Sequence, residues 1–326
     1  MLSSGYTVLE MNDRLPLIII NPAAGGGAAG RSWASAAATI RSHFGPYECT
    51  FTEGEGDATR IAEEQSRAGR PFLITFGGDG TISEVARGIL RSGAAAELGV
   101  LPQGTGADFP RTLGTPNRLA DAARALRFGE PRRIDTGRVE YTDAEGKNAS
   151  RYFINSSSFG LSGEVAKRMN QANRSSGISA VFGGKLAYAT HTVKAAFAFD
   201  APEVWLQADE HEKRRLPITQ VSVNNGRFFG GGMKIAPEAR LVDGLLDLVV
   251  IRKVSFARIL ADGPRIYTGT HISLPEVDHL QVKSIRAWPV DEAVSVGVEV
   301  DGETPGILPA RFEVYPAALT VRVPVS

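Results

Sequence analysis

A glycine-rich turn, Gly77-Gly78-Asp79-Gly80-Thr81, limits most strongly what this chain can fold into. It directly follows the apolar run FLITF at 72–76, which has the length and composition of a buried strand. Apolar residues then recur at the spacing of one helix face, at Ile82, Val85, Ala86, Ile89 and Leu90. A strand, a tight turn and a helix in this order predict a parallel α/β sheet.

The segments on either side extend this pattern. Apolar runs at 15–20 and 98–102 predict further strands, and the periodicity predicts helices over 32–44, 57–68 and 119–126. Beyond about residue 132, short strand-like runs separated by turns predict a mostly antiparallel β domain, interrupted by one helix at 185–199. Because 326 residues exceed one ordinary core, we expect two domains, 14–131 and 132–311, with the last segment, 312–326, returning to the first.

The composition excludes several classes of protein. Lys plus Arg equals Asp plus Glu at 36 each, so no overall positive charge favours nucleic-acid binding. Cys49 is the one cysteine, which excludes an intrachain disulfide and fits a reducing compartment. The N-terminus lacks the pattern of a secretory signal, and the run at 15–20 is too short to span a bilayer. We therefore expect a cytoplasmic protein whose membrane contacts are local.

An earlier glycine cluster, GGGAAGRS at 25–32, follows the first predicted strand and allows three interpretations. It fits the dinucleotide fingerprint G-x-G-x-x-G, although Glu48 is a poor candidate for the acidic residue expected downstream. It nearly fits the Walker A pattern, but Arg31 replaces the lysine that reaches the phosphates. It could also be a flexible turn before a helix.

The turn at 77–81 repeats the same context, so two neighbouring loops could hold one nucleotide at the same edge of the sheet. Glycine lets backbone N–H groups approach phosphate closely, and the helix dipole adds partial positive charge. Asp79 would repel phosphate unless Mg²⁺ lies between them, which indicates a catalytic or metal-linked role. An Asp-Gly turn that only stabilises its own backbone is the alternative.

Five segments together resemble the diacylglycerol kinase catalytic domain shared by bacterial lipid kinases, sphingosine kinases and ceramide kinases. They are GGDGT followed by IxEV, NPAAGGG at 21–27, LPQGTGADFPRTLG at 101–114, NGRFFGGGMKIAPEARLVDGLLDLVVI at 225–251, and VEVDGE at 298–303. The resemblance covers nearly the whole chain. It implies an α/β nucleotide-binding domain, like that of NAD kinases and diacylglycerol kinases, followed by a mostly antiparallel β-sandwich domain.

The resemblance also implies site residues. Nucleotide contacts map to Asn21, Pro22, Ala23, Ala24, Gly25, Thr52, Gly78, Asp79, Gly80, Thr81, Ile82, Ser83, Glu84 and Thr105. The catalytic acids map to Asp79, Asp108, Asp301 and Glu303, with Glu303 as the first candidate for proton acceptor and Asp108 tied to Asp79 through magnesium and water. A structural Mg²⁺ site maps to Asp243 and the backbone oxygens of Arg240 and Leu245. Without the resemblance, the Asp-Gly pairs at 243 and 301 would be interpreted as hairpin turns.

The chain departs from the family at two positions. Ser83 and Ala107 stand where the family usually has asparagine. At Ala107 a side chain that can donate and accept hydrogen bonds has become a methyl group, so reduced or altered activity is one expectation. Asp79, Asp108, Asp243, Asp301 and Glu303 are all present, which argues against simple loss of function.

The resulting hypothesis is a kinase that uses ATP and Mg²⁺ to phosphorylate a lipid hydroxyl, such as that of diacylglycerol. Apolar residues at 182–199, with Phe228 and Phe229, offer a route for the lipid or fill the second core. We expect the protein to bind the lipid at the membrane surface through a peripheral and transient contact. Whether it forms a homodimer is left open. The alternatives are a soluble-substrate kinase similar to NAD kinase and a catalytically silent nucleotide-binding regulator.

Overall fold

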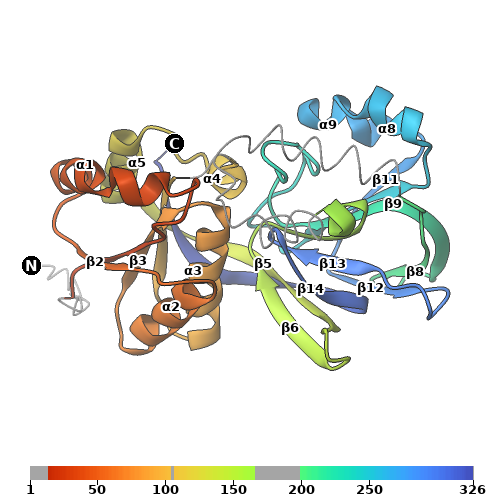
Figure 1. Ribbon diagram of the computed structural model, residues 1–326, viewed down its shortest axis with the longest axis horizontal. Helices are drawn as coiled ribbons and strands as arrows, with labels where there is room; N and C mark the ends of the chain where they lie inside the picture. The colour runs from red at the N-terminus through yellow and green to blue at the C-terminus, as the bar shows by residue number, and fades with distance from the viewer. Residues whose placement is uncertain (1–13, 104–105, 166–198, 326) are drawn as a thin grey trace, which may run out of the picture.

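The computed structural model describes residues 14–103, 106–165 and 199–325. Figure 1 shows two lobes side by side, the N-terminal one built from parallel strands and helices and the C-terminal one mainly from antiparallel strands. This arrangement confirms the predicted fold class. Within the described residues, none of the helices has the length and apolar character needed to span a membrane.

The N-terminal lobe alternates strands and helices. Its elements are β1 (Leu17–Ile20), α1 (Ala28–His43), β2 (Glu48–Phe51), α2 (Asp57–Arg67), β3 (Phe72–Gly77), α3 (Asp79–Ser92), β4 (Glu97–Pro102), α4 (Asp108–Leu113) and α5 (Leu119–Phe128). The strands lie in the order β2-β1-β3-β4 and are all parallel. Their carboxyl ends therefore share one edge, which is where ligands bind in such sheets.

Both faces of this sheet are covered by helices. Leu17 and Ile19 of β1 pack on the side of α2 and α3, whereas Ile18 and Ile20 pack on the side of α1 and α5. Alternate residues of a strand point to opposite faces, so a fully apolar strand fits a sheet buried on both sides. The predicted stripe on α3 is buried, apart from Leu90, which is only partly buried.

The C-terminal lobe contains the remaining elements. They are β5 (Glu130–Thr142), β6 (Asn148–Phe153), β7 (Ser156–Gly160), β8 (Glu203–Ala208), β9 (Arg214–Asn224), β10 (Leu246–Arg252), α8 (Phe256–Asp262), α9 (Arg265–Thr268), η1 (Thr270–Ser273), β11 (Val277–Val282), β12 (Ser284–Pro289), β13 (Gly297–Val300) and β14 (Glu303–Val323). The path β11-β10-β9-β7-β13-β14 is antiparallel throughout.

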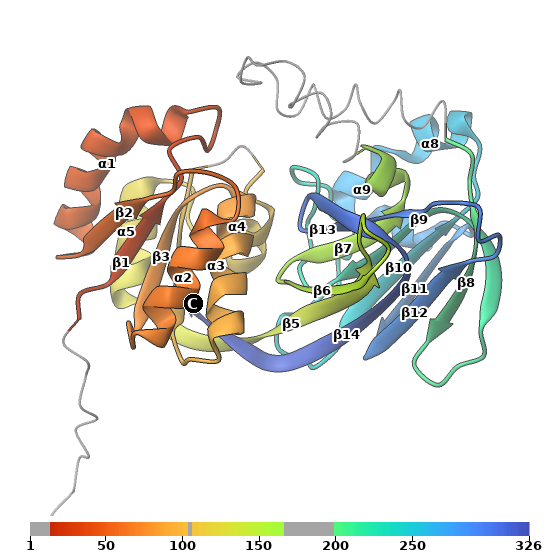
Figure 2. The same ribbon diagram turned by 60° about the horizontal axis from the view of Figure 1, so that its bottom comes forward.

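Two long strands connect the lobes, as Figure 2 shows for β5 and β14. They pair antiparallel from Thr142 opposite Ile307 to Glu130 opposite Val323. Near its end β14 also pairs parallel with β4, Val321 lying opposite Leu98. One continuous sheet therefore runs through both lobes and limits how far they can separate.

The helices α8 and α9 were not predicted. The prediction of a single helix in this half was wrong, because both helices are too short for a 3.6-residue period to stand out and neither contains a buried residue. A local signal existed at Ser255, whose side chain caps α8 by accepting a hydrogen bond from the N–H of Arg258. The helix predicted at 185–199 lies outside the described residues except for its last position.

Candidate active site

The N-termini of α3 and α4 meet at Asp79. Its carboxylate accepts hydrogen bonds from the N–H of Phe109 (3.1 Å, Oδ1) and of Asp108 (3.3 Å, Oδ2). Gly106 lies so close that a Cβ there would be 2.8 Å from Oδ2 of Asp79. Burial raises the pKa of Asp79, and the neighbouring carboxylate of Asp108 raises it further. Two carboxylates are thus held close together at the edge where the parallel strands end.

Asp108 links this edge to the C-terminal lobe. Its Oδ2 accepts a hydrogen bond from the N–H of Gly231 (2.8 Å), and its Oδ1 from Arg111 (3.2 Å). The Arg111 guanidinium also lies over the ring of Phe228, 5.3 Å from the centroid. The loop that follows β9 therefore reaches across to the first lobe and places its backbone against Asp108.

The two glycine-rich loops lie next to each other, as the sequence predicts. The Asn21 side chain donates to Thr81 Oγ1 (3.0 Å) and accepts from the N–H of Ala23 (3.0 Å). A Cβ on Gly77 would lie 2.5 Å from Thr81 Oγ1, so the second turn tolerates only glycine there. Gly25, Gly26 and Gly27 have φ values of 61°, 64° and 82°, which favour glycine.

The structure narrows the three interpretations of the first cluster. Both terminal nitrogens of Arg31 donate to the carbonyl of Gly26 (3.3 Å), so the guanidinium folds back on its own loop instead of occupying the position of a Walker lysine. Pro22 and Gly30 approach closely, because the N–H of Gly30 donates to the Pro22 carbonyl (3.2 Å). The cluster is therefore a tight strand-to-helix turn beside the second glycine loop.

Several predicted nucleotide contacts point elsewhere. Ile82 is fully buried, and its N–H donates to the Gly78 carbonyl, so it offers neither a side chain nor a free backbone donor. Ser83 is buried and donates to Asp301. The Glu84 carbonyl accepts from Thr59 of α2 (3.1 Å), which places that turn of α3 against its neighbouring helix. At these three positions the structure shows contacts within the protein, and their assignment to the nucleotide stays a prediction.

Other predicted nucleotide positions remain compatible with the loops. Thr52 is buried just after β2, and its N–H donates to the Ile20 carbonyl (2.8 Å). Ala24 is partly buried, and its N–H donates to the Asn21 carbonyl (3.1 Å). Gly80 is exposed in the first turn of α3. Thr105 lies outside the described residues.

A second acidic centre lies between β13 and β14 and packs against the flank of α3. The Asp301 carboxylate accepts four hydrogen bonds, from Ser83 Oγ (2.7 Å) and from the N–H groups of Ile154, Asn155 and Ser156 (3.0–3.1 Å). Burial raises the pKa of Asp301, although these donors oppose the shift. Asp301 is thus almost saturated with donors and joins the two lobes.

Glu303 completes this centre as an ion pair. Its carboxylate binds Arg87 of α3 (2.8 Å) and Arg151 of β6. Burial alone would raise the pKa of Glu303, but the two guanidinium groups outweigh it and hold the pKa below its ordinary value. Arg87 comes eight residues after Asp79, about 12 Å along the helix. The ion pairs and the lowered pKa argue against Glu303 as the proton acceptor, and that assignment stays a prediction.

Comparison with known proteins identifies the family. Residues 16–139 match the diacylglycerol kinase catalytic domain, and residues 155–323 match the YegS C-terminal NAD kinase beta sandwich-like domain. The chain belongs to the diacylglycerol kinase catalytic-domain family. It is 32% identical over 283 residues to the "Probable lipid kinase YegS-like" of Pseudomonas aeruginosa, covering 83% of each chain. This family is one of lipid kinases, so the chain is a kinase.

Two further relatives extend the comparison. A "Diacylglycerol kinase" of Mycobacterium tuberculosis is 28% identical over 308 residues, or 94% of each chain. The crystal structure of a diacylglycerol kinase from Bacillus anthracis has a TM-score of 0.70 at 22% identity, covering 96% of this chain and 98% of that one. At this identity the solved structure supports the fold alone.

The kinase departs from its family at Ala107, and the structure shows the local consequence. Ala107 is the N-cap of α4, with φ 50° and ψ 40° and no side-chain cap. This left-handed conformation is tolerated by asparagine and glycine but strained for alanine. Ser83 is the milder departure, because its hydroxyl makes the hydrogen bond to Asp301 described above.

The predicted metal position at Asp243 lies in an acidic environment. Asp243 accepts a hydrogen bond from the N–H of Leu245 (3.1 Å). Burial raises its pKa, and the carboxylates of Asp247 and Asp135 raise it further, which a bound cation would offset. Among the described residues, no group of three or more His, Cys, Asp or Glu side chains is arranged to hold a metal. The site at Asp243, with Arg240 and Leu245, stays a prediction.

An apolar cavity of about 560 Å³ lies in the C-terminal lobe, beneath α8 and α9. Its wall includes Phe229 and Met233, whose backbones pair with each other on either side of Gly231. Because Gly231 contacts Asp108, one short loop separates the cavity from the first acidic centre. The sequence placed apolar lining at Phe229 but gave no signal for the part contributed by α8 and α9.

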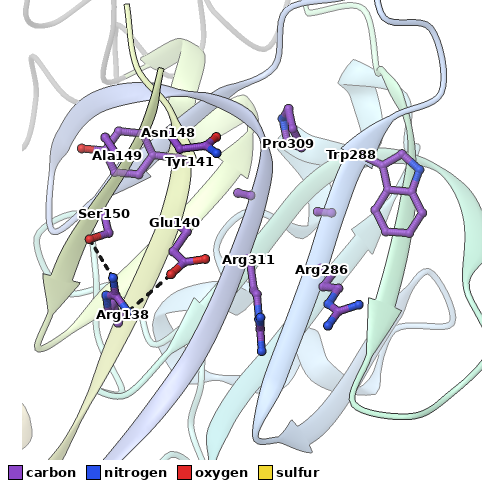
Figure 3. Close-up of a pocket in the computed structure, with 12 residues that line it drawn as sticks. Arg138, Glu140, Tyr141, Asn148, Ala149, Ser150, Arg286, Trp288, Pro309 and Arg311 are labelled. Carbon is purple, nitrogen blue, oxygen red and sulfur yellow. Dashed lines mark hydrogen bonds and ion pairs between the residues drawn. The ribbon is translucent and has the colours of Figure 1, made fainter. Parts of the chain in front are cut away.

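A second hollow has a different character. It is a groove of about 610 Å³ on the sheet formed by β5, β6, β12 and β14, and Figure 3 shows Arg138, Arg286 and Arg311 along it. Arg138 points toward Ser150 and Glu140. No predicted site residue lines this groove, so it is separate from the candidate active site.

Sequence reasoning missed three residues of the site. Arg87 and Arg151 hold Glu303, and Gly231 holds Asp108. For Arg87 a signal existed, because Asp79, Ser83 and Arg87 recur every four residues and share one face of α3. For the other two no local pattern indicates which distant carboxylate they meet.

Proposed function

We propose that this kinase transfers the γ-phosphoryl group of ATP to a hydroxyl group of a lipid of the diacylglycerol kind, with Mg²⁺ as the required metal ion. One observation carries the proposal: Gly231 contacts Asp108 at the phosphate edge while its neighbours Phe229 and Met233 line the apolar cavity. A lipid chain in the cavity would thus present its polar head toward the two carboxylates. The names of the relatives, a lipid kinase and a diacylglycerol kinase, support the same substrate class.

The nucleotide would be held by the adjacent glycine loops. The backbone N–H groups of Gly25, Gly26 and residues 78–80 lie at the start of α1 and α3, where the helix dipoles favour phosphate. Asn21 and Thr81 fix the two loops to each other through their side chains. This pre-arrangement lowers the entropic cost of aligning the γ-phosphate with the acceptor.

Asp79 is the group we assign to the proton of the acceptor hydroxyl. It lies at the edge where the glycine loops end, one short loop away from the cavity that would hold the lipid, which is where a general base is needed. As the hydroxyl oxygen bonds to the γ-phosphorus, its proton passes to Asp79 and the bond to the ADP oxygen breaks. Asp108 keeps this carboxylate in place by donating its backbone N–H to Oδ2.

The residues fit a magnesium ion. Asp79 and Asp108 lie close enough for one carboxylate to raise the pKa of the other, and this repulsion is what a divalent cation relieves. Mg²⁺ is commonly held by one or two carboxylates together with substrate phosphates, keeping several water ligands. When bound, it would offset the negative charge of the triphosphate.

The membrane contact would be peripheral, because the lipid must leave the bilayer to enter a cavity within the C-terminal lobe. We propose that α8 and α9 lie near the entrance, since exposed Leu260 and Tyr267 extend the apolar lining outward. Reversible binding through a few apolar side chains suits an enzyme without a strong positive charge.

The test is transfer of labelled γ-phosphate from ATP with Mg²⁺ to a panel of lipids in mixed micelles, with NAD as soluble control. Phosphorylation of a lipid, abolished in Asp79→Asn, is the expected result. Phosphorylation of NAD alone would replace the proposal with a soluble-substrate kinase. Binding of ATP without transfer to any acceptor would indicate a silent regulator, the alternative that the strained Ala107 favours.

A further inference from the structure

A chain of buried polar side chains leads from the second acidic centre to the wall of the apolar cavity. Glu299 of β13 accepts hydrogen bonds from the N–H of Gly302 and from the hydroxyl of Ser158. Ser158 in turn meets the hydroxyl of Ser162 (2.7 Å), and Ser162 meets the amide of Gln220 (2.7 Å). Ser162 and Gln220 both line the cavity.

The direction of these hydrogen bonds follows from counting donors. An ionised Glu299 carboxylate only accepts, so Ser158 must donate to it. The hydrogen of Ser158 is then used, so in the bond between the two hydroxyls Ser162 is the donor. Gln220 donates to Ser162 Oγ and to the Val221 carbonyl (3.2 Å), which uses both its hydrogens. Each hydrogen shared between neighbours in the chain therefore points toward Glu299, and the second hydrogen of Gln220 is used by Val221.

The cavity wall consequently presents acceptors. Among the described residues, Ser162 Oγ keeps one lone pair, and Gln220 Oε1 accepts only the N–H of Ser162 (2.8 Å), which leaves it a second lone pair. Gln220 is 6% exposed and Ser158 is fully buried, so neither is an adaptable surface group. Arg258, which also lines the cavity, is ion-paired with Asp262 (2.6 Å). Ser162 and Gln220 thus form a fixed accepting pair in an otherwise largely apolar wall.

We propose that Ser162 and Gln220, oriented by Glu299 through Ser158, select a lipid that carries a hydrogen-bond donor in addition to the hydroxyl that is phosphorylated. A free second hydroxyl or an amide N–H meets this requirement, whereas an ester does not. This inference rests on the proposed lipid kinase function and revises its substrate class, because a diacylated glycerol lacks a second donor whereas hydroxyl- or amide-bearing lipids have one. Ser162 and Gln220 are specificity residues in this role, and Glu299 is a positioning residue.

The energetic reason is that a buried acceptor pair is satisfied only by the right ligand. A lipid without the donor would cover these oxygens with hydrocarbon, which costs free energy because they lose water without gaining a partner. A single hydrogen bond contributes about 1.4 kcal/mol at the upper part of its usual range, which corresponds to about tenfold in kcat/KM.

The experiment compares two acceptors that differ in one hydrogen: a monoacylglycerol and its methyl ether at the secondary hydroxyl, each with the primary hydroxyl free. Burial raises the pKa of Glu299 to about 7, so the assay is run above that pH, where the carboxylate is ionised. We expect wild-type kcat/KM to favour the free hydroxyl by about tenfold, and Ser162→Ala to bring the ratio to within about twofold of one. Ser162→Thr, which keeps a hydroxyl, should retain the preference.

Glu299→Gln gives a result that a purely structural role would not produce. The N–H of Gly302 must face an acceptor, so the new amide places its oxygen there and its NH₂ toward Ser158. Ser158 then accepts and donates to Ser162, whose hydrogen turns into the cavity. We expect the preference to disappear or to invert toward the ether. Ser157→Ala, next to Ser158 on β7, is the matched control, because its hydroxyl donates to the Glu299 backbone carbonyl (2.6 Å) and not to the carboxylate.

The outcomes separate the two proposals. Transfer to both lipids with equal efficiency by the wild-type enzyme, or an unchanged ratio in Ser162→Ala, would overturn this inference and leave the lipid kinase function intact. No transfer to any lipid would refute the proposed function and this inference with it. If Glu299→Gln fails to fold, the wild-type ratio and the pair Ser162→Ala and Ser162→Thr still decide.

Discussion

Helix α3 serves two acidic centres that differ in how their charge is compensated. At its N-terminus, Asp79 and Asp108 face each other and are held mainly by backbone N–H groups. Along its flank, Asp301 and Glu303 are matched by Ser83 and Arg87 of the helix itself, with Arg151 as a second cation. In the first centre the negative charge exceeds the positive charge beside it, whereas in the second centre the two guanidinium groups balance the two carboxylates.

This difference separates a reaction centre from a joint between lobes. Burial, and after it the neighbouring carboxylate of Asp108, raises the pKa of Asp79, an arrangement that costs stability and suits a site for a cation. The opposite charges of Arg87 and Arg151 lower the pKa of Glu303, and such an ion pair suits a contact that holds the two lobes together. The predictions below test this division, in order of decreasing effect.

The largest effect is expected at the first centre. Asp79→Asn removes the charge that would bind the hydroxyl proton but keeps the shape of the side chain, so kcat should fall by about 10²–10⁴-fold. Relief of the repulsion with Asp108 opposes the loss of one hydrogen bond, since the NH₂ of asparagine must face the N–H of Phe109 or of Asp108. Unfolding by urea should therefore show only a small change in stability. Turnover near the wild-type value would remove Asp79 from the mechanism.

At the second centre the loss should appear in stability. Arg87→Met leaves Glu303 with Arg151 alone, and removing one partner of a largely buried pair costs about 3 kcal/mol, measurable by urea denaturation. Arg91→Met is the matched control on the same helix, since Arg91 is exposed and pairs with Glu63, and it should cost less than about 1 kcal/mol. Equal losses of stability in the two variants would contradict the role of the Arg87–Glu303 pair in joining the lobes.

The contrast between the centres also marks what the sequence could predict. The ends of parallel strands share an edge, so the meeting of the loops at 21–27 and 77–81 followed from element order alone. The pairing of Ser83 with Asp301 joins residues 218 positions apart, and no local pattern fixes which helix turn meets which hairpin. The apolar stripe of α3 indicated that Ile82 is buried, but nothing in the sequence indicated that Ser83 binds the other lobe.

The same limit applies to the cavity. The sequence indicated an apolar route from aromatic residues, but the wall built by α8 and α9 depends on two helices too short to have a clear period. The polar chain ending at Ser162 was not predicted either, because each hydroxyl is unremarkable until β7, β9 and β13 are brought together.

Glu299 lies two residues before Asp301 of the second centre but differs from it in its partners. Its buried carboxylate accepts hydrogen bonds and, among the described residues, is paired with no cation. Burial, together with the charges of Asp301 and Glu303, raises its pKa from 4.5 to about 7, which corresponds to about 3 kcal/mol. The folded state thus binds this proton more tightly than the unfolded state. The stabilisation is complete below pH 4.5 and is lost as the pH rises to about 7.

The measurement for Glu299 is the free energy of unfolding of wild type relative to Glu299→Gln across this pH range. The glutamine variant cannot ionise, so the difference should shift by about 3 kcal/mol in its favour as the pH rises. Glu313→Gln is a control on β14, since Glu313 is partly exposed and pairs with Arg311. A difference independent of pH would mean that Glu299 is compensated after all.

The smallest effect is expected at Ala107, beside the first centre. Its left-handed backbone costs alanine about 1 kcal/mol, so Ala107→Gly should raise the melting temperature by roughly 1–3 °C. Ala107→Asn tolerates the same conformation and can also accept an N–H from the first turn of α4. If asparagine stabilises more than glycine and raises kcat, the missing side chain had a role in holding Asp108; if the two variants are equal, only the backbone was strained. Ala107→Val, which suits this conformation least, should destabilise, and a stable valine variant would show that the strain is absent.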